Sequence, residues 1–292
     1  MFRVHRSTLS THSEVFADMF RIPQPPDHDI IEGCSVVHLP DSANDFIYLL
    51  KALYDPLYVE TTFFSKPNKD FVRYFSGTQA DPPIPFDAIA GILRLSNKYD
   101  IPPIRRRCIH ELRRHFPCTL AAFDATILNA PPLSTLMPTK AIILARECNA
   151  LDILPCAFYL LCQAETEAFL DILTLLPQQE IRTCLLGRER LRVVLETATL
   201  SFALNPNPSP TCTDRAGCRP NGLEFLSAAI SQRIHAGFYA LEKNNVDKML
   251  NDHLCYICTE DRIFAHIRGR EKVWNELPGY FGLGTWEALR AN

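Results

Sequence analysis

The sequence lacks the two features that would assign it to a membrane or to nucleic acid. Its longest apolar stretch, 151–162, contains Asp152 and Pro155 and is much shorter than the about 20 residues that a membrane-spanning helix needs. The amino terminus has no apolar core of signal-peptide length, so we expect an intracellular protein, cytoplasmic or nuclear. The formal net charge of -3 provides no overall basic field, which disfavours nucleic acid as the main partner.

The sequence also has few glycines and none of the common catalytic motifs. Only 11 glycines occur, which is few for a chain with several substrate-binding loops. The motifs Gly-x-Gly-x-x-Gly, Gly-x-x-x-x-Gly-Lys, Gly-x-Ser-x-Gly and His-Glu-x-x-His are all missing. Glu165 and Glu167, two positions apart on a predicted helix, point to different faces and form no carboxylate pair. We therefore expect a protein that is not an enzyme.

The composition is that of a folded protein, and the pattern of apolar residues is mainly helical. Hydrophobic residues make up 47% of the chain and charged residues 22%, values typical of globular domains. The predicted fold class is α+β and predominantly helical, with a small sheet and flanking helices over residues 1–116. An all-α carboxyl-terminal domain with a cysteine-rich segment is predicted over residues 117–292.

The first 116 residues contain the only predicted strands. Apolar and polar residues alternate over Phe2-Arg-Val-His5, as in a half-buried strand, and Ser35-Val-Val-His-Leu39 predicts a second strand. Ser13 is expected to cap a helix that begins at Glu14. Prolines and a glycine interrupt any period over 58–85, which predicts an insertion loop. Helices are predicted over 14–21, 86–99 and 104–112. A further helix is expected to begin within 40–45, to carry the apolar residues of 46–53 and to stop at Asp55-Pro56.

The remaining residues predict helices and a proline-rich linker. The helical patterns cover 140–149, 151–162, 165–176, 177–204 and 222–241. Asn205-Pro-Asn-Pro-Ser-Pro210 is expected to be a rigid, extended linker. Large apolar residues near the carboxyl end are expected to pack onto the helices: Trp274, Leu277, Pro278, Phe281, Leu283 and Trp286.

The 11 cysteines are scattered, and their odd number argues against a disulfide framework. Five of them have apolar neighbours along the chain and are expected to be buried thiols: Cys108, Cys148, Cys156, Cys162 and Cys184.

Four further cysteines have spacings that fit a metal site. Cys212 and Cys218 lie in or beside the proline-rich linker, and Cys255 and Cys258 form a Cys-x-x-Cys pair. Two such pairs can hold one zinc ion in a tetrahedron, with His253 and His266 as alternate ligands. Four thiolates leave no open position for water, so the site would be structural. Because a Cys-x-x-Cys pair also arises by chance in a cysteine-rich chain, two independent reduced pairs and a redox pair remain open alternatives.

The amino-terminal part resembles a BTB/POZ domain. Phe2-Arg-Val-His-Arg-Ser-Thr-Leu9, followed by Ser13-x-Val-Phe16-x-x-Met19-Phe20, resembles the signature of that family, and Leu93-Arg-Leu-Ser-Asn-Lys-Tyr99 resembles the helix before its closing hairpin. The carboxyl-terminal part, with Gly187-Arg-Glu-Arg-Leu191 and Trp274-Asn-Glu-Leu-Pro-x-x-Phe-Gly-Leu283, resembles BTB proteins of mushroom-forming fungi.

The resemblance implies a protein-binding α/β module that often dimerises. It also implies an adaptor or scaffold in transcriptional or ubiquitin-ligase complexes, with other proteins as partners and a homodimer through the BTB-like domain. Domains of this family have a strand before the Phe-x-Val-His segment, and here the sequence begins at that segment. We therefore expect either that this strand is missing or that the start codon is misplaced. The alternative function is that of a zinc-stabilised nuclear regulator that contacts nucleic acid.

Overall fold

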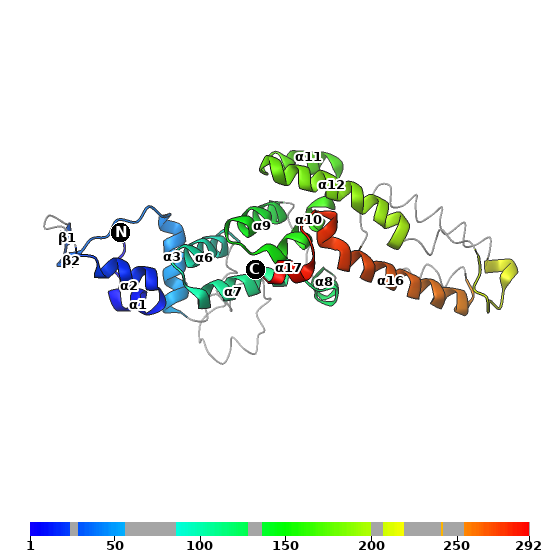
Figure 1. Ribbon diagram of the computed structural model, residues 1–292, viewed down its shortest axis with the longest axis horizontal. Coiled ribbons are helices and arrows are strands. Elements are labelled where there is room, and N and C mark those ends of the chain that lie inside the picture. Colours follow the sequence, from blue (N-terminus) through cyan, green and yellow to red (C-terminus); the bar gives the residue numbers. More distant parts are fainter. Residues whose placement is uncertain are drawn as a thin grey trace, which may run out of the picture. The chain divides into compact units, whose positions relative to one another are not determined.

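The structure, a computed structural model, describes residues 1–23, 29–55, 86–127, 136–199, 207–218, 241 and 254–291 (Figure 1). The described part is mostly helical and contains a small two-stranded antiparallel sheet. The chain divides into two compact units, Met1–His115 and Phe116–Asn292. The predicted insertion loop, 58–85, and all of the predicted helix 222–241 except Leu241 lie outside the described residues.

The first unit begins with two short helices, α1 (Arg6–His12) and α2 (Glu14–Arg21). The prediction that Ser13 caps α2 is confirmed, because its hydroxyl accepts a hydrogen bond of 3.1 Å from the backbone N–H of Phe16. The same hydroxyl donates to the carbonyl of Tyr99 at 2.5 Å. The Phe16 ring is fully buried and stacks on Tyr99 with centroids 4.2 Å apart. The cap and this ring pair fix α2 against the end of a helix far along the chain.

The predicted strand over Phe2-Arg-Val-His5 is wrong, because Met1 to His5 form no strand and a helix begins at Arg6. The backbone N–H of His5 donates to the hydroxyl of Tyr54 at 3.2 Å instead of to a neighbouring strand. Four residues of alternating pattern are too few to fix a strand when a helix follows directly.

The second predicted strand is also displaced. The observed sheet is a hairpin of β1 (Ile30–Ile31) and β2 (Cys34–Ser35), whose four residues are exposed. Glu32 and Gly33 both have positive φ, 49° and 75°, which is the combination that a type I′ hairpin turn requires. Only Val36 extends the pairing further, by a bond from its N–H to the carbonyl of Asp29. The sheet is therefore smaller than predicted and contributes no buried side chain to the core.

The core of the first unit is formed by three helices, α3 (Ala43–Tyr54), α6 (Phe86–Lys98) and α7 (Pro102–His115). The helix α6 packs against both of the others. Gly91 allows the approach of α3, since a Cβ at this position would collide with the side chain of Asp45. The large side chains that are fully buried in this core include Leu49, Ile89, Ile92, Leu93, Ile101 and Leu112.

The second unit begins with α8 (Leu120–Ile127), α9 (Leu136–Glu147), the 3-10 turn η1 (Leu151–Ile153) and α10 (Leu154–Cys162). It continues with α11 (Thr166–Leu173), α12 (Gln178–Val194) and a π-helical turn, η2 (Leu195–Thr199). All residues of α10 except Leu160 are buried. This helix therefore forms the centre of the unit, packed between α9, α12 and the later helix α16 (Figure 1).

The longest helix of the described part, α16 (Tyr256–Tyr280), runs alongside α12 and η2 and is followed by α17 (Trp286–Arg290). Gly269 makes the close approach of α16 to η2 feasible, because a Cβ there would lie 2.5 Å from the carbonyl oxygen of Ala198. The predicted packing of the aromatic carboxyl end is confirmed. Trp274 and Trp286 are buried and stacked, and the Trp286 indole N–H donates to the carbonyl of Trp274 at 2.8 Å.

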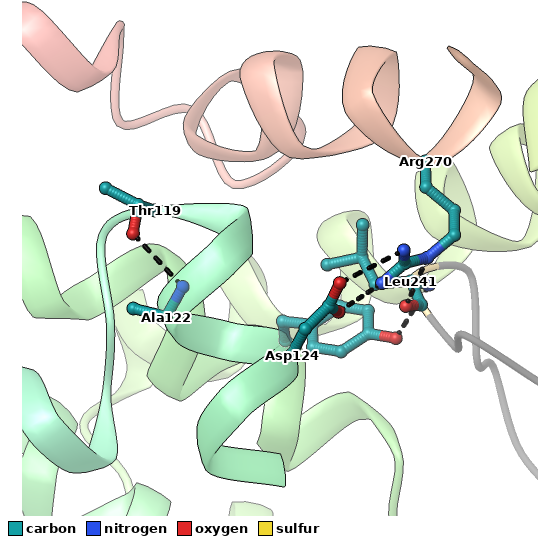
Figure 2. A network of polar contacts seen from close by, with 6 residues as sticks. Thr119, Ala122, Asp124, Leu241 and Arg270 are labelled. Carbon is teal, nitrogen blue, oxygen red and sulfur yellow. Dashed lines mark hydrogen bonds and ion pairs between the residues drawn. The ribbon is translucent and has the colours of Figure 1, made fainter. Parts of the chain in front are cut away.

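A partly buried ion pair connects α8 to α16 (Figure 2). The two terminal guanidinium nitrogens of Arg270 donate hydrogen bonds to the carboxylate of Asp124. The Nε of Arg270 donates to the carbonyl of Leu241 at 2.9 Å. The backbone N–H of Leu241 in turn donates to the hydroxyl of Tyr159 on α10. These bonds fix Leu241 between two helices of the unit.

Among the described residues, no helix has the length and apolar character to cross a membrane.

Candidate metal centre

The four cysteines with metal-site spacing are brought together by the fold. The Sγ atoms of Cys212, Cys218, Cys255 and Cys258 all lie within 4.8 Å of one another, and each is a free thiol. The sulfur atoms of Cys212 and Cys255 are 3.7 Å apart. Sulfurs at the corners of a zinc tetrahedron with Zn–S of about 2.3 Å would be separated by about 3.8 Å. The arrangement therefore has the size of a four-thiolate metal site.

Two turns of the linker position the first pair of thiols. The N–H of Cys212 bonds to the carbonyl of Ser209 at 3.0 Å, and Pro210 occupies the second position of this turn, where its fixed φ is favoured. The carboxylate of Asp214 accepts from the N–H of Gly217 at 3.0 Å, as a helix cap does. The N–H of Cys218 then bonds to the carbonyl of Asp214, which places Cys218 one turn further on.

The first turn of α16 positions the second pair. Cys255 is the N-cap residue, with extended backbone angles, and Cys258 lies in the first turn of the helix. The two thiols therefore lie at the amino end of a helix, where backbone N–H groups have no partner within the helix and favour negative charge.

Backbone donors point at the sulfur atoms. The N–H of Cys255 donates to the sulfur of Cys218 at 3.2 Å, and the N–H of Ser209 donates to the sulfur of Cys258 at 3.4 Å. These two bonds cross between the linker and the helix, so each segment supplies a donor to a thiol of the other. Such donors stabilise thiolate sulfur more than thiol sulfur.

The protonation of the thiols is unequal. Hydrogen bonding from the backbone of Cys258, together with the backbone and hydroxyl of Thr213, lowers the pKa of Cys255 to about 5 against the effect of burial. Burial raises the pKa of Cys258 to about 12 and also raises the pKa of Cys218. At neutral pH without a cation, one sulfur is anionic and the two buried ones carry protons. A metal ion would have to displace these protons.

Among the described residues, neither of the two histidines predicted as alternate ligands is found in the group of four thiols. His266 is buried on α16, but it is not in the group of four, and its Nδ1 lies 3.2 Å from the carbonyl oxygen of Thr199. His253 lies outside the described residues. Among the residues that the structure describes, this is the one group of three or more His, Cys, Asp or Glu side chains close enough to share an ion.

The remaining cysteine predictions are confirmed, since all five predicted buried thiols are buried: Cys108, Cys148, Cys156, Cys162 and Cys184. Sequence reasoning missed the residues around the thiols, namely the donors Ser209 and Thr213 and the buried Arg262 on α16. These three residues were not predicted, because their role depends on how the linker meets the helix.

No family model, no curated protein and no solved structure matches the chain. The BTB/POZ resemblance therefore rests on the quoted residues alone and remains a prediction.

Proposed function

We propose that this protein is a non-catalytic adaptor whose carboxyl-terminal unit is held together by one structural zinc ion. The observation that carries the proposal is the group of four thiols within 4.8 Å of one another. A site made only of sulfur ligands favours zinc or iron over magnesium or calcium, which prefer oxygen. With all four corners of the tetrahedron supplied by the chain, zinc would have no position for water or substrate, as in structural sites.

The proposed zinc ion would join the linker to the beginning of α16. Cys218 and Cys255 are 37 positions apart in the chain, and a bond between them through the metal closes the segment between them into a loop. Closing a long loop removes conformational freedom from the unfolded chain, so the ion would stabilise the folded state. In this function the metal stabilises the fold of the unit and carries out no chemistry.

The adaptor role is supported by the amino-terminal unit. Its resemblance to BTB/POZ domains implies protein binding, and apolar side chains are exposed at and before the hairpin. Ile22 is 62% exposed, Ile30 60% and Ile31 44%. Exposed apolar side chains are candidates for a surface that binds another protein. We propose this hairpin segment as the part of the unit that docks partners.

The zinc proposal is tested by measuring metal in protein purified without added metal or chelator. One zinc ion per chain is expected in the natural sequence and none in the variant Cys255→Ser, Cys258→Ser. The variant Cys34→Ser, at an exposed cysteine outside the group, is the control and should keep its zinc. Protein that is folded but contains less than about one tenth of an equivalent of zinc, and takes up none, would refute the proposal.

The adaptor proposal is tested by comparing the proteins that co-purify with the natural chain and with Ile30→Ser, Ile31→Ser. The double variant should lose defined partners that a control, Leu170→Ser, keeps, because Leu170 is 54% exposed, between Ile30 and Ile31, but lies on α11. Identical partner sets for all three would refute docking at the hairpin. Binding that falls steeply with salt and is abolished by nuclease would instead favour the nucleic-acid alternative.

A further inference from the structure

The buried face of α16 continues from the thiols to a buried cation. Cys255, Cys258 and Arg262 are separated by three and then four positions, so the three side chains lie on one face of the helix. Arg262 is only 6% exposed. A guanidinium is thus placed one helical turn after Cys258, on the side of the helix that carries the sulfur group.

Arg262 interacts electrostatically with the two buried thiols. Burial lowers the pKa of Arg262, and its interactions with Cys258 and then Cys218 act in the opposite direction. Cys218 and Cys258 are the two members of the group that are fully buried, whereas Cys212 and Cys255 are partly exposed. The positive charge therefore lies near the thiols that water screens least.

A four-thiolate zinc centre needs such a charge. Four thiolates and one Zn²⁺ have a formal net charge of minus two, and burying an anion is costly unless a cation or hydrogen-bond donors compensate it. The backbone donors to the sulfurs supply partial charges, and Arg262 supplies a full one. An arginine tolerates burial beside an anion better than a lysine, because its charge is delocalised and it is never deprotonated in proteins.

We propose that Arg262 is the charge-compensating residue of the metal centre and sets the affinity of the four thiolates for zinc. This inference rests on the proposed zinc site and deepens it. Arg262 acts as a positioning residue, because it binds no metal itself and acts through the sulfurs of Cys218 and Cys258. Groups around a metal's ligands typically change metal affinity by about 10–100-fold when they are mutated.

The test compares three single variants in a competition for zinc against a coloured chelator. Arg262→Met removes the charge and keeps most of the aliphatic volume, and Arg262→Lys keeps the charge. Arg268→Met is the matched control, because Arg268 lies on the same helix but is exposed. The expected result is a zinc affinity about 10–100-fold lower for Arg262→Met, a smaller loss for Arg262→Lys and no change for Arg268→Met.

Cobalt(II) substitution separates a charge effect from a loss of structure. Tetrahedral cobalt with four sulfur ligands has a characteristic visible spectrum, and this spectrum should be the same in Arg262→Met as in the natural protein. An unchanged zinc affinity in Arg262→Met would overturn the inference, as would an equal loss in the Met and Lys variants. If the natural protein itself held no zinc, the proposed function would fail, and this outcome is seen before any variant is compared.

Discussion

The sulfur atoms of Cys212 and Cys255 lie 3.7 Å apart, although 43 positions separate the two residues in the chain. One belongs to a turn of the linker and the other caps the longest helix of the described part. In Figure 1 the linker segment lies beside the beginning of α16, at the end of the helix remote from α17. The contact brings a segment with few buried apolar residues to a long helix, and sulfur atoms take part in hydrogen bonds between the two.

Removal of zinc should destabilise the carboxyl-terminal unit. A ligand at a free concentration of about 1,000 times its Kd stabilises the folded state by about 4 kcal/mol. For a unit of this size that corresponds to a fall in Tm of roughly 10 °C when the metal is removed. The measurement is thermal unfolding with and without a strong chelator. A chelator effect of equal size in Cys255→Ser, Cys258→Ser would mean that it acts elsewhere.

Replacement of Gly269 by alanine should weaken the packing of α16 on η2. The added methyl group would lie 2.5 Å from the backbone carbonyl of Ala198, so the helix must shift, at a cost of about 1–3 kcal/mol in the free energy of unfolding. Gly279→Ala, on the same helix with nothing within 4 Å of the added atom, is the control. It should be neutral or slightly stabilising in denaturant unfolding. Equal effects of the two variants would contradict the observed helix contact.

Replacement of Arg270 by methionine should lower the free energy of unfolding more than removal of an exposed arginine does. Arg270 and Asp124 have side chains that are 4% and 21% exposed, and loss of the guanidinium leaves the partly buried carboxylate without its donors, which costs about 1.5–3 kcal/mol. Arg192→Met breaks an exposed pair with Glu189, whose side chains are 52% and 64% exposed, and should cost at most about 1 kcal/mol. Chemical denaturation of both variants measures the difference. A loss below about 1 kcal/mol for Arg270→Met would contradict the buried network.

The stability of the amino-terminal unit should depend on pH through Asp41. Burial raises the pKa of this carboxyl, but bonds from Lys98, at 2.6 Å, and from the Tyr99 hydroxyl outweigh it, and the pKa is lowered. Because the folded pKa is depressed, the stabilisation is present above the unfolded value of about 3.9 and is lost as pH falls through the folded pKa.

Asp41→Asn should therefore be less stable than the natural chain at pH 7, by about 1.5 kcal/mol or more. The difference should shrink below about pH 4 and vanish once Asp41 is protonated. Asp18→Asn, in an exposed pair with Arg21, is the control and should have a small effect at every pH. Urea unfolding at a series of pH values gives the comparison. A difference between Asp41→Asn and the natural chain that persists at the lowest pH would exclude the ionic explanation.

Local signals were sufficient to predict most of the helices. The cap at Ser13, the stop at residues 55–56 and the period of apolar residues in 86–99 are readable because each acts within a few positions. The two strands were predicted incorrectly because strand formation is not decided within a few positions. Whether Phe2 to His5 forms a strand depends on a partner strand elsewhere in the chain, and the local pattern carries no information about that partner.

The long helix α16 was not predicted. Gly269 and Pro278 lie inside it and read locally as interruptions, yet the glycine serves the approach to Ala198. The metal-site cysteines were predictable because sulfur spacing is a direct signal. The donor Ser209 and the cation Arg262 were not, because their contacts exist only after the linker has folded against the helix.

The central claim is that four thiolates of one chain hold one zinc ion. X-ray absorption at the zinc edge, on protein purified with its natural metal content, measures the ligands directly. The account predicts four sulfur neighbours at about 2.3 Å and no nitrogen or oxygen in the first coordination shell. A spectrum with nitrogen or oxygen ligands, or a folded protein without zinc, would contradict it.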